Sequence, residues 1–340
     1  MAEEFQLHVV ELPLAAAGQR LDQALAAALP QYSRARLQRW IREGAVRLAG
    51  AAAARGAASL ARARDRVRGG ERLEVRAEFS DSGSIEAEAI PLRIVHEDES
   101  LLVLDKPAGL VVHPGAGNRS HTLQNALLAH DERLARVPRA GLVHRLDKDT
   151  SGLLIVARTP ESHTRLVAAL AARAITREYL ALVWGRPVAG GQIEQPIGRD
   201  PAMRTRMAVS RSGRAAVTHY RIEERFAAHT LLRVRLETGR THQIRVHLAH
   251  IGLPIVGDPL YGGRRRRLAS GALNDTLQAF RRQALHATRL TLTHPLTGRL
   301  QSFEAPAPAD LAALLSALRE PEQSPAPRRR ATPAPVRRRP

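Results

Sequence analysis

The chain has 340 residues, with 52 Lys and Arg against 33 Asp and Glu, a formal net charge of +19 and no cysteine. The lack of cysteine excludes disulfides, thiol nucleophiles and cysteine-ligated zinc sites. Such a basic excess favours a polyanionic partner, nucleic acid first, over a membrane surface, because no long apolar run or lipidation motif accompanies it. The acidic N-terminal residues lack the apolar core of a secretory signal, so we expect a cytoplasmic protein.

The first part of the chain, residues 11–79, predicts a small α/β domain. Ser33 is a good N-cap for a helix, and Gly44 suits the C′ position after it. The expected elements are helices over Arg20–Leu29 and from Ser33 to Gly44, and short strands over Ala45–Leu48 and Glu71–Val75.

The second of these helices carries an apolar arc, and arginines occupy the rest of its circumference. Such a face suits RNA phosphates, although a solvated surface is the simpler explanation for a lone helix. The net charge of the chain favours contact with RNA. The arginines are Arg34, Arg36, Arg39 and Arg42.

This first part resembles the S4-type RNA-binding domain. The matching segments are Arg20-Leu21-Asp22, Tyr32-Ser33-Arg34, residues 41–46 and residues 70–73. Where the family usually has Asn-Gly-Lys, this chain has Ala49-Gly50-Ala51. The resemblance implies a two-helix platform for RNA.

Residues 80–90 are rich in Ser, Gly and acidic side chains, which predicts a linker. We expect a second domain over residues 91–320. The Pro/Arg-rich residues 321–340 predict a disordered basic tail. In the second domain the strands outnumber the helices without regular interleaving, which predicts an α+β fold with a mixed, mostly antiparallel sheet. We expect strands over Leu92–Val95, Leu101–Leu104, Leu153–Val156, Ile175–Trp184, Val217–Ile222, Thr230–Leu236 and Arg289–Leu292, and helices from Pro160 through Leu170 and over Thr241–Ile251, the latter with Ile244, Leu248 and Ile251 facing the core.

The loop from His144 to Gly152 is the most informative segment, because it places Asp147 between two cations directly before a buried strand. Arg145 and Lys148 are close to it in sequence, but neighbours on an extended segment point to opposite faces, so a charge partner is expected from elsewhere. Two arginines at a strand-to-helix junction, Arg240 and Arg245, are candidates. A guanidinium within about 4–6 Å would keep the carboxylate ionised as a nucleophile or base, and a structural ion pair is the alternative.

Two metal-binding interpretations are weaker. Asp147 and Asp149 could share a face and bind Mg²⁺, but Lys148 lies between them and no third acid clusters nearby. On a helix only His247 and His250, of the three histidines from His242 onward, face the same way, so surface or RNA-facing histidines are expected. No phosphate-binding loop of the ATPase type occurs.

The second part resembles the RluA-type pseudouridine synthases along essentially its whole length. The matching motifs are His144-Arg145-Leu146-Asp147 with its continuation, residues 105–114, Arg177-Glu178-Tyr179, residues 239–245 and residues 257–263. The family often has Lys where Arg177 stands, a change that keeps the charge. With the S4-like first part, the chain is most similar to the family members that act on the large ribosomal subunit.

The resemblance implies a cofactor-free and metal-free isomerisation of uridine to pseudouridine, on a uridine flipped out of the RNA stack. The implied substrate is 23S ribosomal RNA or a large-subunit precursor, at the stem-loop called helix 69, and a monomer is expected. The implied roles are an essential carboxylate for Asp147, base stacking for Tyr179, pairing with Asp147 for Arg245, filling of the vacated stack for Arg145, and RNA contacts for Lys148, Arg240 and His242.

A non-catalytic RNA-binding or ribosome-assembly factor is the alternative from another class. It would keep the charge, the S4-like part and the tail, and it would not need Asp147. Mapping pseudouridine after incubation with helix-69 RNA separates the two.

Overall fold

A computed structural model describes residues 5–30, 32, 34–49, 62–78, 85–115, 117–203, 205–263 and 272–320. The described residues fall into two compact units, one within 1–90 and 114–141 and the other within 91–113 and 142–340. The expected N-cap Ser33, the linker residues 80–84 and the tail 321–340 lie outside the described residues. Because residues 114–141 group with the first unit, the domain limits 11–79 and 91–320 stay a prediction.

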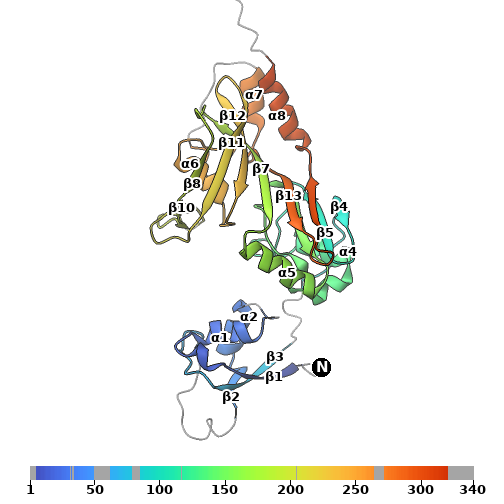
Figure 1. Cartoon of the computed structure of the whole chain (residues 1–340), viewed down its shortest axis with the longest axis vertical. Coiled ribbons are helices and arrows are strands. Elements are labelled where there is room, and N and C mark those ends of the chain that lie inside the picture. Colours follow the sequence, from blue (N-terminus) through green and yellow to red (C-terminus); the bar gives the residue numbers. More distant parts are fainter. Residues whose placement is uncertain are drawn as a thin grey trace, which may run out of the picture. The chain divides into compact units, whose positions relative to one another are not determined.

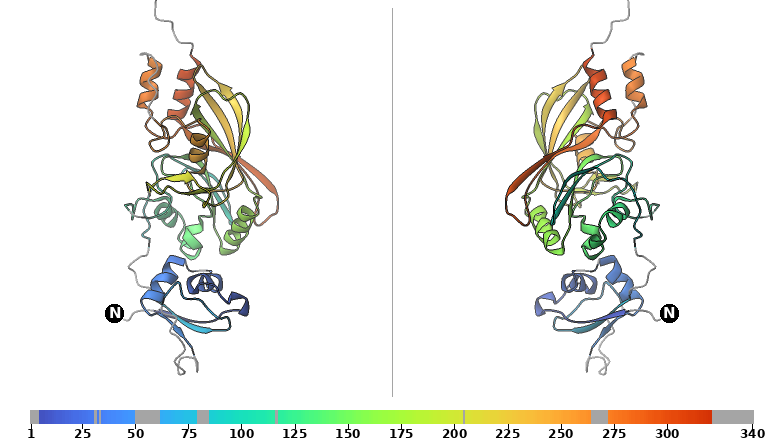
Figure 2. Two further views of the ribbon diagram at one scale, coloured as in Figure 1. Left: turned by 90° about the vertical axis from the view of Figure 1, so that its left-hand side faces the viewer. Right: turned by 90° about the vertical axis from the view of Figure 1, so that its right-hand side faces the viewer.

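A three-stranded antiparallel sheet in the order β1–β3–β2 carries two helices on one face in the first unit (Figure 2). The buried side chains of Leu25, Leu37, Trp40 and Leu73 form the centre of its core. Gly44 has φ +74°, as its C′ position requires. The elements are β1 (Phe5–Glu11), η1 (Leu14–Ala16), α1 (Leu21–Ala28), α2 (Arg34–Arg42), β2 (Val46–Leu48) and β3 (Arg72–Glu78).

The rest of the first unit is helical. In α4 (Leu123–His130) the N-cap Thr122 and Asn125 form a reciprocal capping box. Asn125 also donates to Glu86 O at 2.7 Å and accepts from Glu88 N at 3.1 Å, so the end of the expected linker is hydrogen-bonded to this segment. The 3-10 helices η2 (Glu132–Arg136) and η3 (Pro138–Gly141) follow.

The second unit is built on a nine-stranded sheet in the order β4–β5–β6–β13–β7–β12–β11–β8, with β14 paired to β13 (Figure 1). Every pairing in it is antiparallel except β6 with β13, which confirms the expected α+β fold with a mixed, mostly antiparallel sheet. The strands are β4 (Ile94–Glu97), β5 (Leu101–Lys106), β6 (Ser151–Ala157), β7 (Thr176–Trp184), β8 (Gly191–Glu194), β11 (Val217–Arg225), β12 (His229–Leu236), β13 (Leu285–Thr293) and β14 (Leu300–Glu304).

Gly152 marks the point where β6 leaves the Asp147 loop and approaches β13. Its φ is +109°, and a Cβ there would lie 2.6 Å from Ala287 N, so only glycine fits. The close approach places the loop beside the central strands β13 and β7.

The helices of the second unit begin largely where capping residues predict. Thr159 Oγ1 accepts from Ser162 N at 3.1 Å, which confirms the expected N-cap of α5 (Pro160–Ala171). The expectation for Ile251 was wrong: it is 37% exposed, because α6 (Gln243–His250) ends one residue earlier. The remaining elements are the hairpin β9 (Ile197–Arg199) and β10 (Met207–Val209), α7 (Ala272–Ala279) and α8 (Ala309–Arg319).

The expected strand Leu92–Val95 is displaced by two residues. Asp98 closes a tight turn by accepting from Ser100 N at 2.8 Å and Leu101 N at 2.9 Å, so β4 continues to Glu97. No helix in the described part of the chain is both long and apolar enough to span a bilayer.

Candidate active site

Asp147 lies in the loop that leads into β6, with 17% of its side chain exposed. A buried lysine holds this loop. Lys106 Nζ donates to Lys148 O at 2.9 Å, and Gly109 N donates to the same oxygen at 2.9 Å. Two further acceptors of Lys106, Pro107 O at 2.7 Å and Leu110 O at 2.9 Å, complete the set that an ammonium can serve. Burial lowers the pKa of Lys106 to about 7, and the nearby Asp149 and Asp147 charges oppose that shift.

Arg245 links Asp147 to a second carboxylate. Its Nη1 donates to Asp147 Oδ2 at 3.0 Å, while Nε and Nη2 donate to the two oxygens of Asp258 at 2.7 and 2.9 Å. The guanidinium is 5% exposed and the Asp258 carboxylate 0%. Burial alone would lower the pKa of Arg245, but the hydrogen bonds and charges of Asp258 and Asp147 raise it above its ordinary value. Arg245 is therefore a fixed cation beside Asp147.

Backbone amides fix the far end of this pair. Asp258 Oδ1 also accepts from Leu260 N at 2.9 Å and Tyr261 N at 3.0 Å. A buried carboxylate with four donors needs no solvent, so Asp258 can hold the Arg245 guanidinium in one orientation toward Asp147.

The start of α6 is set by Gln243, which places Arg245 in the first turn of the helix. Its Oε1 accepts from Thr238 Oγ1 at 2.8 Å and Arg240 N at 3.0 Å, and its Nε2 donates to Val217 O at 3.0 Å. These bonds tie the loop between β12 and α6 to the edge of β11.

Tyr179 lies in the centre of the sheet, where β7 pairs it with Val234 of β12 and Ala287 of β13. The residue is 5% exposed. Burial raises the pKa of its hydroxyl, and the charge of Asp147 raises it further, against the opposing charge of Arg177. The hydroxyl is therefore protonated at neutral pH, and the side chain can offer an aromatic face and a hydrogen-bond donor.

Comparisons with known proteins identify the family of the chain. Residues 100–250 match the RNA pseudouridylate synthase family and residues 19–55 match the S4 domain. The chain is 54% identical over 312 residues to ribosomal large subunit pseudouridine synthase D of Pseudomonas aeruginosa, which covers 91% of this chain and 95% of that protein. The chain belongs to the RNA pseudouridylate synthase family.

Other relatives of this synthase carry the same description or the same fold. The chain is 52% identical over 304 residues to ribosomal large subunit pseudouridine synthase D of Escherichia coli K12, over 89% of this chain and 91% of that protein. The structure of human RNA pseudouridylate synthase domain containing 4 superposes with a TM-score of 0.54 at 26% identity, over 67% of this chain and 93% of that one. The structure of human RNA pseudouridylate synthase domain containing 1 superposes with a TM-score of 0.51 at 25% identity, over 70% of this chain and 90% of that one. The expected family and S4 domain are confirmed.

The synthase structure brings two of the expected site residues to Asp147. Besides Arg245, His242 has its Nε2 3.9 Å from Asp147 Oδ1. The side chains of Arg145 and Lys148 are exposed, which leaves them accessible to RNA. Arg240 is half-buried and donates through Nε to Ala215 O at 3.1 Å. The roles assigned to these residues stay predictions.

The two metal interpretations find no geometry to support them. Among the described residues, no group of three or more histidine or acidic side chains lies close enough to hold a metal ion. The expectation that His247 faces the surface or RNA was wrong, because it is buried between Thr218 Oγ1 and Gln195 O, each at 2.9 Å. His250 is exposed.

The α2 arginines differ in how free they are to meet RNA. Arg34 donates to the buried Asp22 carboxylate through Nε at 2.9 Å, although its own side chain is 44% exposed. The Arg36 guanidinium lies 5.7 Å from the Trp40 ring. Arg39 Nε is 3.6 Å from a Glu43 carboxylate oxygen, and the exposed Arg42 donates to Gln38 O at 3.3 Å.

Three residues of the site had no predicted role. Asp258, Tyr261 and Lys106 all stand in motifs that carried the resemblance, but an aspartate between glycine and proline resembles an ordinary turn residue. The one usable signal was Lys106, because Lys106 and Lys148 are the only lysines in the sequence.

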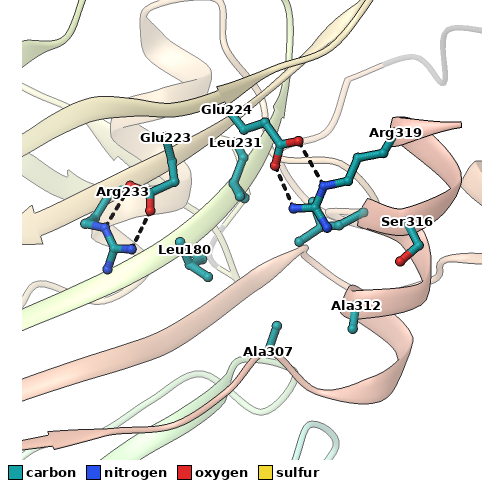
Figure 3. A pocket seen from close by; sticks show the side chains of 10 residues that line it. Leu180, Glu223, Glu224, Leu231, Arg233, Ala307, Ala312, Ser316 and Arg319 are labelled. Carbon is teal, nitrogen blue, oxygen red and sulfur yellow. Dashed lines mark hydrogen bonds and ion pairs between the residues drawn. The ribbon is translucent and has the colours of Figure 1, made fainter. Parts of the chain in front are cut away.

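A pocket of about 480 Å³ lies elsewhere in this unit, between the β7–β12–β11 region and α8 (Figure 3). Leu180 and Arg233 line it, and alternation along β7 directs Tyr179 to the opposite face of the sheet. Its charges pair with one another, Arg233 with Glu223 and Arg319 with Glu224, each at 2.6 Å. This pocket is separate from the Asp147 site.

Proposed function

We propose that this synthase isomerises uridine to pseudouridine in 23S ribosomal RNA of the large subunit or its precursor, at the helix-69 stem-loop. The relatives named for the large ribosomal subunit support the substrate class. The S4 match supports RNA binding through the first part of the chain. The protein acts as a cytoplasmic monomer without a cofactor, with domains over 11–79 and 91–320.

The reaction moves one bond and one proton. The bond between N1 of the base and C1′ of the ribose breaks, C5 bonds to C1′, the C5 proton leaves and N1 gains a proton. Asp147 is the nucleophile or base for this exchange. Tyr179 stacks on the flipped base, and Arg145 fills the space the uridine leaves. Lys148 and Arg240 supply phosphate contacts.

The observation that carries the proposal is the hydrogen bond from Arg245 Nη1 to Asp147 Oδ2 at 3.0 Å, with Arg245 itself held by the buried Asp258. A fixed cation at Oδ2 sets the orientation of the carboxylate, and Oδ1 keeps an acceptor site for the substrate. This geometry favours an oriented reactive carboxylate over an ion pair that only stabilises the fold.

Replacing Asp147 with Asn tests this proposal. The variant should lose isomerisation while its RNA affinity stays within a few-fold, because the volume is nearly unchanged and the reactive group is gone. Pseudouridine mapping on helix-69 RNA and an RNA-binding titration provide the two readouts. Asp149→Asn, the same exchange two residues along the loop, is the matched control and should stay active. Turnover of Asp147→Asn near that of the wild type excludes the catalytic role. Wild-type RNA binding with no pseudouridine formed favours the non-catalytic factor.

A further inference from the structure

His242 adopts an unusual backbone conformation next to Asp147. It has φ 57° and ψ 22° at the start of α6, and its side chain makes no capping hydrogen bond. A left-handed backbone is uncommon for histidine and persists where the surroundings hold it in place. The ring instead faces Asp147, with Nε2 3.9 Å from Oδ1.

Tyr261 determines which nitrogen of His242 carries the proton. Its hydroxyl oxygen accepts from Met207 N at 2.9 Å and lies 2.8 Å from His242 Nδ1. An amide only donates, so the hydroxyl hydrogen is the one available for Nδ1. Burial raises the pKa of Tyr261, so the hydroxyl keeps this hydrogen at neutral pH. A neutral imidazole then has its N–H on Nε2, the atom that faces Asp147.

The surroundings of His242 do not suit a phosphate contact. Its side chain is 17% exposed. Burial lowers its pKa, although the Asp147 charge opposes that shift, and the Arg245 charge lowers the pKa further. At neutral pH the ring is therefore an oriented dipole and not a cation.

The same tyrosine also supports Arg245. The Arg245 guanidinium lies 5.0 Å from the centre of the Tyr261 ring, and Tyr261 N donates to Asp258 Oδ1. The imidazole of His242 and the guanidinium of Arg245, which face the two oxygens of Asp147, thus both contact the side chain of Tyr261. Arg206, at 5.1 Å, lies against the same ring and comes from the segment before β10.

We propose that His242 is a positioning residue for Asp147, held by Tyr261 so that its Nε2–H faces Asp147 Oδ1. This inference rests on the proposed function, in which Asp147 is the reactive carboxylate. The atoms stand beyond hydrogen-bond distance in the free protein, and such bonds commonly close only in the substrate complex. Together with Arg245, the imidazole fixes the plane of the carboxylate before the uridine arrives.

Two substitutions at His242 distinguish donation to Asp147 from a purely structural role, because each role predicts that a different variant is the more active one. Gln places a side-chain N–H at about the reach of Nε2, whereas Asn ends at the level of Nδ1. The left-handed backbone favours Asn over Gln. Donation to Asp147 therefore predicts that His242→Gln keeps most of the single-turnover rate and that His242→Asn loses at least about tenfold, with RNA affinity unchanged in both. A purely structural role predicts the reverse order.

Tyr261→Phe is the companion variant. It keeps the ring against Arg245 and removes the hydroxyl, so its rate on helix-69 RNA should fall like that of His242→Asn without loss of RNA affinity. A His242→Asn variant as fast as the wild type overturns the inference. So does a loss that appears in RNA affinity and its salt dependence instead of the rate, because that result makes His242 an RNA contact.

The wild-type protein supplies a readout other than activity. Nitrogen-15 NMR of labelled histidines should show the His242 ring neutral with its hydrogen on Nε2, its signal assigned by its loss in His242→Gln. A hydrogen on Nδ1 overturns the inference. If the wild type is as inactive as Asp147→Asn, the proposed function fails and the inference with it. If the wild type is active and His242→Asn is equally active, only the inference fails.

Discussion

Tyr179 combines an aromatic face with a hydroxyl that stays protonated, because burial raises its pKa. Tyr179→Phe should lower the isomerisation rate more than RNA binding, since the ring still stacks and only the polar group is lost. Tyr179→Ala should weaken binding as well and cost about 3–5 kcal/mol of stability through the cavity it leaves. Rate, RNA affinity and urea unfolding are the measurements, and Tyr220→Phe on β11 is the matched control. Identical behaviour of the two Tyr179 variants in rate and affinity contradicts the stacking role.

Asp258 compensates a buried cation, and its loss should be costly for that reason. Asp258→Asn leaves the Arg245 guanidinium without its paired charge, for which about 3–5 kcal/mol of destabilisation is expected. Asp310→Asn breaks a similar two-point pair with Arg282 at a carboxylate that is 49% exposed, so it should cost no more than about 1 kcal/mol. Urea unfolding of both variants is the comparison. Equal losses contradict the view that Asp258 carries the buried charge.

At this scale the sequence was informative about the type of residue but not about its partner. Asp147 could be singled out because its loop concentrates charge directly before a strand. Its bond to Arg245 joins residues 98 positions apart, and no local periodicity encodes that distance. The resemblance supplied the pair. Asp258 and Tyr261 act through other side chains, and such roles depend on where a folded sheet places them.

At the scale of elements, Asp22 joins the two helices of the S4 part. It accepts hydrogen bonds from Arg20 and Gln38 besides Arg34. Burial alone would raise the pKa of Asp22, but these hydrogen bonds lower it to about 2. A carboxyl group whose folded pKa lies below its unfolded value stabilises the fold above the unfolded pKa, near 3.8, and that stabilisation is lost as the pH falls through about 2.

The stability difference between the wild type and Asp22→Asn should therefore be largest at pH 5–7 and shrink between about pH 4 and pH 2. Trp40 lies in this core, so its fluorescence in a Trp184→Phe background reports urea unfolding of the S4 part. Asp65→Asn, which removes a surface carboxylate that accepts from the Arg62 amide, is the matched control. A pH-independent difference contradicts the assigned charge pair.

The bounds of elements that begin or end at Pro, Gly or a capping residue were predictable to within about two residues. Pro160 opens α5 and Gly44 follows α2, as their backbone preferences require. Some of the elements that were missed carry weak signals. In α4, Gln124 and Asn125 are buried beside leucines, which hides its amphipathic pattern, and β8 to β10 are too short to show alternation.

At the scale of the whole molecule, the S4 part should control affinity and the second unit the chemistry. A chain that begins at Ile85 removes the S4 core but keeps the bonds of Glu86 and Glu88 to Asn125. It should isomerise helix-69 RNA at saturating concentration with a rate within a few-fold of the full chain, because Asp147, Tyr179 and Arg245 remain.

Its RNA affinity should fall, and the slope of log K against log[salt] should flatten by roughly 0.7–0.9 for each RNA phosphate that α2 neutralises in the full chain. Binding titrations across a salt series, with the full chain as the control, measure this slope. An unchanged slope with a lower catalytic rate shows that the α2 arginines do not bind the RNA.

The place of β13 in the sheet has a consequence for folding of the enzyme during its synthesis on the ribosome. Residues 285–293 insert between β6 and β7, so the strands on either side are synthesised long before the strand that joins them. Until β13 leaves the exit tunnel, β6 and β7 each present an unpaired edge that is prone to wrong pairing. A nascent chain stalled before residue 285 cannot close the sheet around Asp147. Activity should therefore begin only after β13 has been translated.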